Sequence, residues 1–178
     1  MNRRAAVERI SLILGGAALS PQLTAGLMGQ VTNSGASVAV DDAQQALLAE
    51  LADMIIPTTD TPGAKAAGVE QFIVRLMRDC YVIEEQQSFY DGLGKLDADS
   101  KAAHDGKGFV ELDAAGKKSM LEQTVKSNKA FFKLMKEMTV AGYFTSEIGA
   151  TQALAYLPIP GQFLGDVPLK PGQKAWAM

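Results

Sequence analysis

The sequence predicts an all-α protein: an irregular bundle of about five or six helices with an extended, Pro- and Gly-rich C-terminal arm. Apolar residues recur at helical spacing along most of the 178-residue chain. No stretch shows the period-two alternation of a half-buried strand, and no internal repeat is found. With 47% hydrophobic residues, the chain can bury the core of one domain.

The first helix is expected to begin at Asp41 or Asp42, whose carboxylates can accept hydrogen bonds from the free N–H groups of a first turn. Apolar residues then recur at helical spacing until Pro57 ends the helix. In the polar loop that follows, Pro62 and Gly63 suit the two central positions of a type II turn.

The second helix has the clearest amphipathic pattern in the sequence. Its apolar residues have offsets of 0, 3, 4, 7, 8 and 11, so they share one face: Val69, Phe72, Ile73, Leu76, Met77 and Cys80. Cys80 leaves two interpretations open. It is either a small buried side chain, or a thiol that meets a partner subunit in a compartment where disulfides persist.

The remaining elements are less regular. The next helix is expected to fray near Gly92 and Gly94, because glycine weakens a helix interior. Two further helices should follow, the second running to about Gly142. Ser146 is then expected to cap a short helix that runs through Leu157.

The arm after Leu157 contains too many prolines and glycines for a regular helix or strand. It nevertheless carries large apolar residues, including Phe163 and Trp176, which a disordered tail would lack. We therefore expect the arm to pack, either on its own domain or across a partner.

Residues 1–29 are expected to form a twin-arginine-type (Tat) signal segment, which would direct the folded protein to the periplasm. Arg3 and Arg4 precede a short apolar run, and no residue from Ile10 to Val40 is charged. A signal needs about 7–15 apolar residues, whereas a spanning helix needs about 20. Residues 30–40 should form a polar linker and residues 41–178 a single helical domain. An uncleaved N-terminal anchor and an ordinary amphipathic helix are the alternatives.

The inventory of reactive groups excludes several classes of site. The chain has one cysteine, Cys80, and one histidine, His104, too few for zinc, iron–sulfur or haem ligation. No Rossmann fingerprint or P-loop occurs, so no motif is present with which this chain would bind its own FAD. The formal net charge is -3 without a basic stripe, which argues against nucleic-acid binding.

Two long motifs resemble the gluconate 2-dehydrogenase subunit 3 family. The first covers residues 53–64 and continues at 67–69, and the second covers residues 142–149. Shorter matches lie at residues 153–156, 160–161 and 172–176, so the resemblance extends from about residue 42 to the end. The segment from about residue 83 to 129 contributes little to it.

The resemblance implies a non-catalytic small subunit of a membrane-associated, FAD-dependent dehydrogenase that acts on gluconate, glucose or a related sugar. In such complexes the large subunit, a flavoprotein of the glucose–methanol–choline oxidoreductase type, binds the FAD and oxidises the substrate. A cytochrome c or another acceptor takes up the electrons. The small subunit stabilises its partner, helps it to mature and carries the Tat signal for both. The complex is expected at the periplasmic face of the inner membrane.

We expect the partner interface in the two motifs and the C-terminal arm, with Tyr143 and Phe144 as aromatic anchors. The alternative is that the same residues only terminate helices and pack. The candidate interface residues are Thr59, Asp60, Thr61, Pro62, Tyr143, Phe144, Thr145, Glu147, Phe163 and Trp176. Asp60 and Glu147 are disfavoured as a catalytic pair, because acid–base catalysis needs a pocket and tuned pKa values.

Two other functions are alternatives to the accessory subunit. One is a small exported enzyme or metal-binding protein that acts alone, which the shortage of ligands and cofactor motifs disfavours. The other is a membrane-anchored structural protein that keeps its N-terminal segment.

Overall fold

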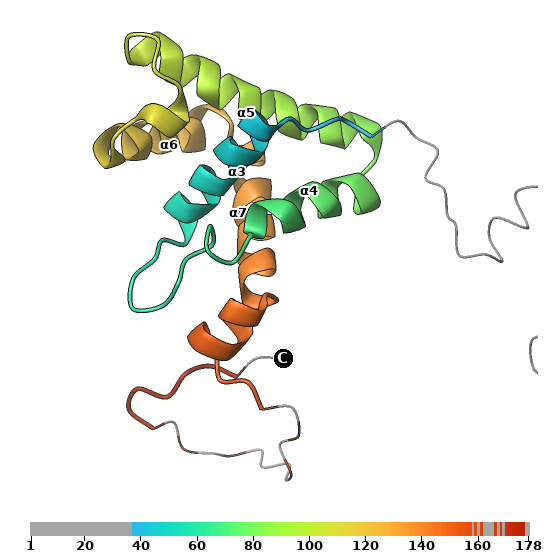
Figure 1. Ribbon diagram of the computed structural model, residues 1–178, viewed down its shortest axis with the longest axis vertical. Helices are drawn as coiled ribbons and strands as arrows, with labels where there is room; N and C mark the ends of the chain where they lie inside the picture. Colours follow the sequence, from blue (N-terminus) through green and yellow to red (C-terminus); the bar gives the residue numbers. More distant parts are fainter. Residues whose placement is uncertain are drawn as a thin grey trace, which may run out of the picture. The chain divides into compact units, whose positions relative to one another are not determined.

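The computed structural model describes residues 37–157, 159, 161, 166, 168 and 170–176 (Figure 1). These residues form five α-helices, one 3-10 helix and one π-helical turn, labelled as in Figure 1. The elements are α3 (Asp42–Ile55), α4 (Val69–Cys80), α5 (Ile83–Ala103), η1 (Phe109–Glu111), α6 (Ala114–Ser127), α7 (Lys129–Phe144) and η2 (Gly149–Ala153). Within the described ranges, the single strand-like feature is a bridge between Ala155 and Trp176. The predicted all-α fold is confirmed.

Polar side chains begin three of the helices by capping free N–H groups of the first turn. Asp41 caps α3: its carboxylate accepts from the Gln44 N–H at 2.6 Å, and the Gln44 side chain accepts from the Asp41 N–H at 3.1 Å. Asp113 caps α6 and Asn128 caps α7 in the same way. Of the two predicted caps for the first helix, Asp41 is the one used.

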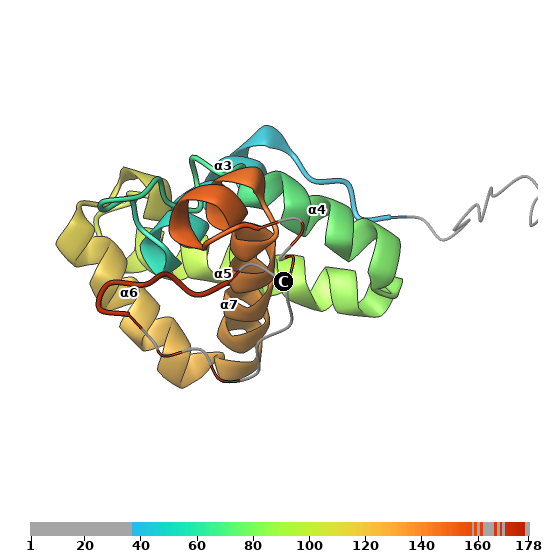
Figure 2. The same ribbon diagram turned by 90° about the horizontal axis from the view of Figure 1, so that it is seen from below.

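The two central helices of residues 37–176 are α3 and α7. Both α4 and α5 contact each of them, and α6 contacts α7 (Figures 1 and 2). Their buried side chains form one hydrophobic core, which includes Leu48, Leu51, Ile73, Met77, Leu93, Phe109, Met120 and Met135. Truncating one such side chain to alanine costs about 2–5 kcal/mol, because apolar contacts are lost and a cavity remains.

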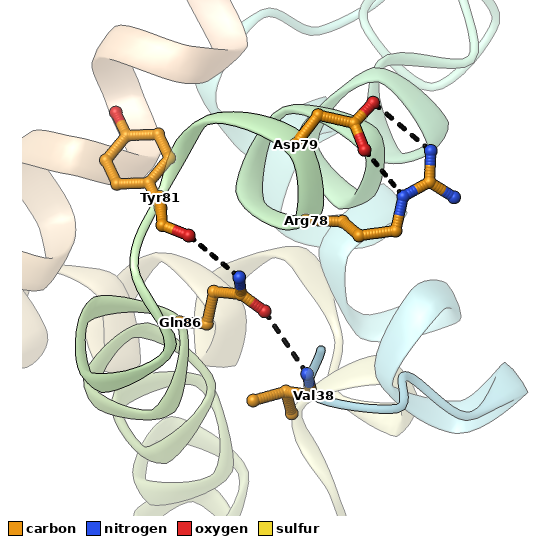
Figure 3. A network of polar contacts seen from close by, with 5 residues as sticks. All are labelled: Val38, Arg78, Asp79, Tyr81 and Gln86. Carbon is orange, nitrogen blue, oxygen red and sulfur yellow. Dashed lines mark hydrogen bonds and ion pairs between the residues drawn. The ribbon is translucent and has the colours of Figure 1, made fainter. Parts of the chain in front are cut away.

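The segment before α3 is attached to the bundle through a buried glutamine (Figure 3). The Gln86 side chain is 4% exposed; it donates to the Tyr81 carbonyl at 2.9 Å and accepts from the Val38 N–H at 3.2 Å. Both its donor and its acceptor capacity are therefore used, as a buried amide requires. Val38 and Val40 also pack against the core. The residues directly before Asp41 therefore belong to the packed unit, as α3 does.

Glu50 of α3 connects two segments that are distant in sequence. Its carboxylate forms ion pairs with Lys117 of α6, at 2.8 Å, and with Lys65 of the α3–α4 loop. The hydrogen bond from Lys117, and then that from Lys65, lower the pKa of Glu50 below its ordinary value of 4.5. The side chains of Glu50 and Lys117 are 18% and 15% exposed, so this pair is screened less than a surface pair.

The helix α5 is continuous, and the predicted fraying near Gly92 and Gly94 is wrong. Gly92 is buried against α7. A Cβ at this position would lie only 2.7 Å from the Phe131 ring, so the absence of a side chain allows α5 and α7 to approach each other. A Cβ at Gly94 would meet no atom within 4 Å. Replacement by alanine should therefore destabilise the protein at Gly92 and stabilise it at Gly94.

We predict that Gly92→Ala lowers the free energy of unfolding by about 1–3 kcal/mol, because the added methyl group displaces Phe131. Gly94→Ala serves as the matched control and should raise it by about 0.5–1 kcal/mol, because alanine favours the helix. Urea unfolding followed by circular dichroism measures both. Equal effects of the two variants would contradict the close approach of α5 and α7.

We predict that Glu50→Gln destabilises the protein by about 1 kcal/mol near neutral pH. Because the folded-state pKa of Glu50 is depressed, its contribution is present above pH 4.5 and is lost as pH falls through the folded value. The stability difference between wild type and variant should therefore vanish in acid. Urea unfolding over a pH series tests this, with Glu122→Gln on the exposed face of α6 as control. A difference that stays constant with pH would contradict the assignment.

Candidate functional site

The loop between α3 and α4 carries the first motif, and it is folded tightly on itself. The Gly63 N–H donates to the Thr58 hydroxyl at 2.9 Å, and the Ala64 N–H donates to the Ile56 carbonyl at 2.9 Å. The Thr59 hydroxyl donates to the Asp60 carboxylate at 2.9 Å. These bonds hold residues 58–64 in one conformation that leaves Thr59 and Asp60 exposed.

Gly63 is required by contact rather than by an unusual backbone angle. A Cβ at this position would lie 2.6 Å from both the Ile56 carbonyl oxygen and the Thr58 nitrogen. Its φ is not positive, so the predicted type II turn at Pro62 and Gly63 is wrong. Pro171 and Gly172 do have that geometry: Gly172 has a φ of 73°, and the Gln173 N–H donates to the Lys170 carbonyl at 3.0 Å.

The second motif forms a turn directly after α7. The Ser146 hydroxyl donates to the Tyr143 carbonyl at 2.6 Å and accepts from the Gly149 N–H at 3.0 Å. A Cβ at Gly149 would lie 1.9 Å from the Tyr143 carbonyl oxygen, so only glycine fits. The Ser146 hydroxyl thus accepts from the first N–H of the following turn, whose N-cap residue is Ile148 and carries no side-chain cap of its own. That turn is the π-helical η2, which ends at Ala153 rather than at Leu157.

Tyr143 joins the two motifs. Its hydroxyl donates to the Pro62 carbonyl at 2.8 Å, across 81 positions of sequence. The Tyr143 ring is 2% exposed and meets the Phe144 ring edge-to-face, at 5.2 Å between centroids. Phe144 itself is 39% exposed. Of the two predicted anchors, Phe144 is therefore accessible to a partner, whereas Tyr143 lies in the core and positions the loop.

The end of the arm returns to the same region. The Ala155 N–H donates to the Ala175 carbonyl at 2.7 Å, which forms the bridge with Trp176. The Lys174 ammonium donates to the Gln152 carbonyl. The hydrogen bond from Thr59 lowers the pKa of Asp60 most, and the nearby Lys174 ammonium lowers it further. The end of the arm is thus held beside residues 152–155, and Lys174 is close enough to the first motif to act on the Asp60 carboxylate.

We call residues 58–64, 143–149 and 173–176 the motif cluster (Figure 2). These ranges contain nine of the ten predicted interface residues: Thr59, Asp60, Thr61, Pro62, Tyr143, Phe144, Thr145, Glu147 and Trp176. Phe163 lies outside the described residues, as do Arg3, Arg4 and the predicted signal segment. The interface role itself stays a prediction.

Cys80 is exposed, so its interpretation as a buried side chain is wrong. It ends α4, one helix length of roughly 16 Å from Val69, which begins that helix. The intermolecular thiol stays a prediction and lies apart from the motif cluster.

A groove of about 560 Å³ lies between α3, α5 and η1, and the sequence analysis did not identify it. Its carboxylates serve the fold: Asp97 accepts from the Phe109 N–H at 2.9 Å, and Glu111 accepts from the Gly108 N–H at 3.0 Å. None of the predicted site residues lines the groove.

Two further features were sought in the part of the chain that the structure describes. No group of three or more His, Cys, Asp or Glu side chains there is arranged to hold a metal ion. Among the same residues, no helix combines the length and the apolar character needed to cross a membrane.

Comparison with known proteins gives one family. The family model described as gluconate 2-dehydrogenase subunit 3 matches residues 42–161, from the first turn of α3 to beyond η2. Both long motifs fall inside the match. No curated protein and no solved structure matches the chain.

We predict that Tyr143→Phe lowers the free energy of unfolding by about 0.5–1.5 kcal/mol, because the Pro62 carbonyl loses its donor. The amides of Gly63 and Ala64 should also exchange faster with solvent, since the loop loses its tether. Urea unfolding and amide hydrogen exchange measure the two effects. Tyr156→Phe makes the same chemical change on a ring that is 58% exposed and should alter neither. Unchanged exchange in Tyr143→Phe would contradict the tether.

Proposed function

The chain belongs to the gluconate 2-dehydrogenase subunit 3 family, and on this premise we propose that it is the non-catalytic accessory subunit of an FAD-dependent sugar or sugar-acid dehydrogenase. The family match over residues 42–161 is the observation that carries the proposal. In this proposal the FAD and the catalytic site belong to a large subunit of the glucose–methanol–choline oxidoreductase type. A cytochrome c or another acceptor receives the electrons.

The use of polar groups in the motif cluster supports an accessory role. The Tyr143 hydroxyl and the Ser146 hydroxyl are both engaged in holding the chain in place. Asp60 is exposed, and its lowered pKa keeps the carboxyl ionised, whereas a general acid needs a raised pKa. Glu147 is likewise exposed. These groups fit the surface of a binding protein better than a catalytic pocket.

We further propose that the accessory subunit escorts its folded partner through the Tat route to the periplasm. Arg3 and Arg4, followed by the short apolar run, support this. A folded chain can carry a bound flavoprotein only if the two associate before export. The accessory subunit would then stabilise the large subunit in the cytoplasm and accompany it at the membrane.

The experiment uses the full-length chain in its own host, with an affinity tag inserted at the exposed residues 105–107 of the loop after α5, so that neither the N-terminal segment nor Trp176 is altered. We expect an FAD-containing dehydrogenase to be recovered with it, seen as flavin absorbance and as sugar-dependent reduction of a dye. Recovery of the chain without any flavoprotein would contradict the accessory role. Stoichiometric flavin on the isolated chain would also contradict it.

A charge-conserving change separates export from binding. In the double variant Arg3→Lys, Arg4→Lys, we expect the dehydrogenase to stay in the cytoplasm while still binding the chain. Arg9→Lys, outside the pair, is the control and should leave the activity in the periplasm. Periplasmic dehydrogenase in the double variant would contradict co-export. Cell fractionation followed by activity staining measures both.

A further inference from the structure

Large apolar side chains are exposed on both sides of the bridge that closes the C-terminal segment. Ile159 is 82% exposed, Tyr156 58% and Trp176 57%. Leu157 is 47% exposed and lies between Tyr156 and Ile159 in sequence. We call these four residues the C-terminal apolar surface. Single exposed apolar residues are ordinary, but four large ones that lie at the bridge or within four residues of it along the chain are typical of a binding surface.

Backbone contacts fix the base of this surface. The Ala155 N–H donates to the Ala175 carbonyl at 2.7 Å, Ala155 forms a parallel bridge with Trp176, and Lys174 donates to the Gln152 carbonyl. The exposed side chains therefore lie at, or directly after, a junction that these hydrogen bonds hold. Holding the base before binding reduces the conformational entropy that association must remove.

We propose that the C-terminal apolar surface is the docking site for the flavin-bearing large subunit, which rests on the function proposed above. Family membership places this chain in a dehydrogenase complex, so part of its surface meets another subunit. Tyr and Trp are the residue types that contribute most binding energy when a partner covers them. The backbone bridge leaves the Trp176 ring free for that contact.

The charges nearby favour a protein partner over a membrane. Between residues 147 and 176, the exposed charged residues are two acids, Glu147 and Asp166, and two bases, Lys170 and Lys174. Mixed charge of this kind suits the polar rim of a protein interface. An anionic lipid surface would instead attract a cluster of basic residues.

The area also indicates a hot spot within a larger interface. A fully covered Tyr or Trp contributes about 150–250 Å², whereas a stable interface covers about 800 Å² on each partner. Tyr156 and Trp176 would therefore supply the centre. The exposed members of the motif cluster, such as Thr59 and Phe144, would supply part of the remainder.

The test measures the affinity of full-length variants for the FAD-containing dehydrogenase recovered with the wild-type chain. We expect Ile159→Asp and Trp176→Ala each to weaken binding about tenfold or more, because a buried apolar contact is lost or charged. Val82→Asp is the matched control: Val82 is 61% exposed and precedes α5, where aspartate is a favoured cap. It should change the affinity less than about twofold. Thermal melts of the free chains confirm that each variant is folded.

Ala155→Pro tests whether the backbone hydrogen bond between Ala155 and Ala175 supports binding, because proline has no N–H to donate. Ala155→Gly keeps this N–H and serves as the control. We expect about tenfold weaker binding for the proline variant, with an unchanged melt of the helices. If Ile159→Asp and Trp176→Ala bind as tightly as Val82→Asp, the docking site is overturned while the accessory function stands. If the wild-type chain recovers no flavoprotein, the accessory function itself fails.

Discussion

The hydrogen bond from the Tyr143 hydroxyl to the Pro62 carbonyl is the contact on which the motif cluster depends. It joins the loop after α3 to the end of α7, and it does so inside the core, where the Tyr143 ring is 2% exposed. An unpaired buried carbonyl would be costly, so the loop and the helix end favour each other's positions. The exposed residues of both motifs are thereby held in defined positions relative to one another.

Glycines allow the close contacts that bring these segments together. Gly142 lets α7 approach α4, because a Cβ there would lie 2.7 Å from the Phe72 ring. Gly63 and Gly149 permit backbone-to-backbone contacts that any side chain would block. Small residues also allow a backbone contact at the C-terminal segment. There the Ala155 N–H donates to the Ala175 carbonyl, and the neighbouring Trp176 ring stays exposed. The proposed docking surface thus consists of side chains that remain exposed in the fold.

The sequence predicted what local chemistry determines. The cap at Asp41, the end of α3 before Pro57 and the full extent of α4 follow from capping, proline and apolar spacing. It failed where distant contacts decide. Gly92 was expected to weaken α5, but the lack of a side chain there lets the Phe131 ring of α7 pack closely against α5. Cys80 continues the apolar spacing of α4, yet its side chain is exposed. The two motifs were identified as a site, but no spacing could show that Tyr143 would reach Pro62.

The central claim is that the motif cluster and the C-terminal apolar surface are already folded in the free chain and together form the surface that a partner subunit covers. Amide hydrogen exchange on the full-length chain, alone and bound to its FAD-containing dehydrogenase, tests this most directly. The account predicts added protection in residues 58–64, 144–149, 155–157 and 173–176, with none in α6 (Ala114–Ser127). Added protection in α6 and the groove beside η1, with these four segments unchanged, would contradict it.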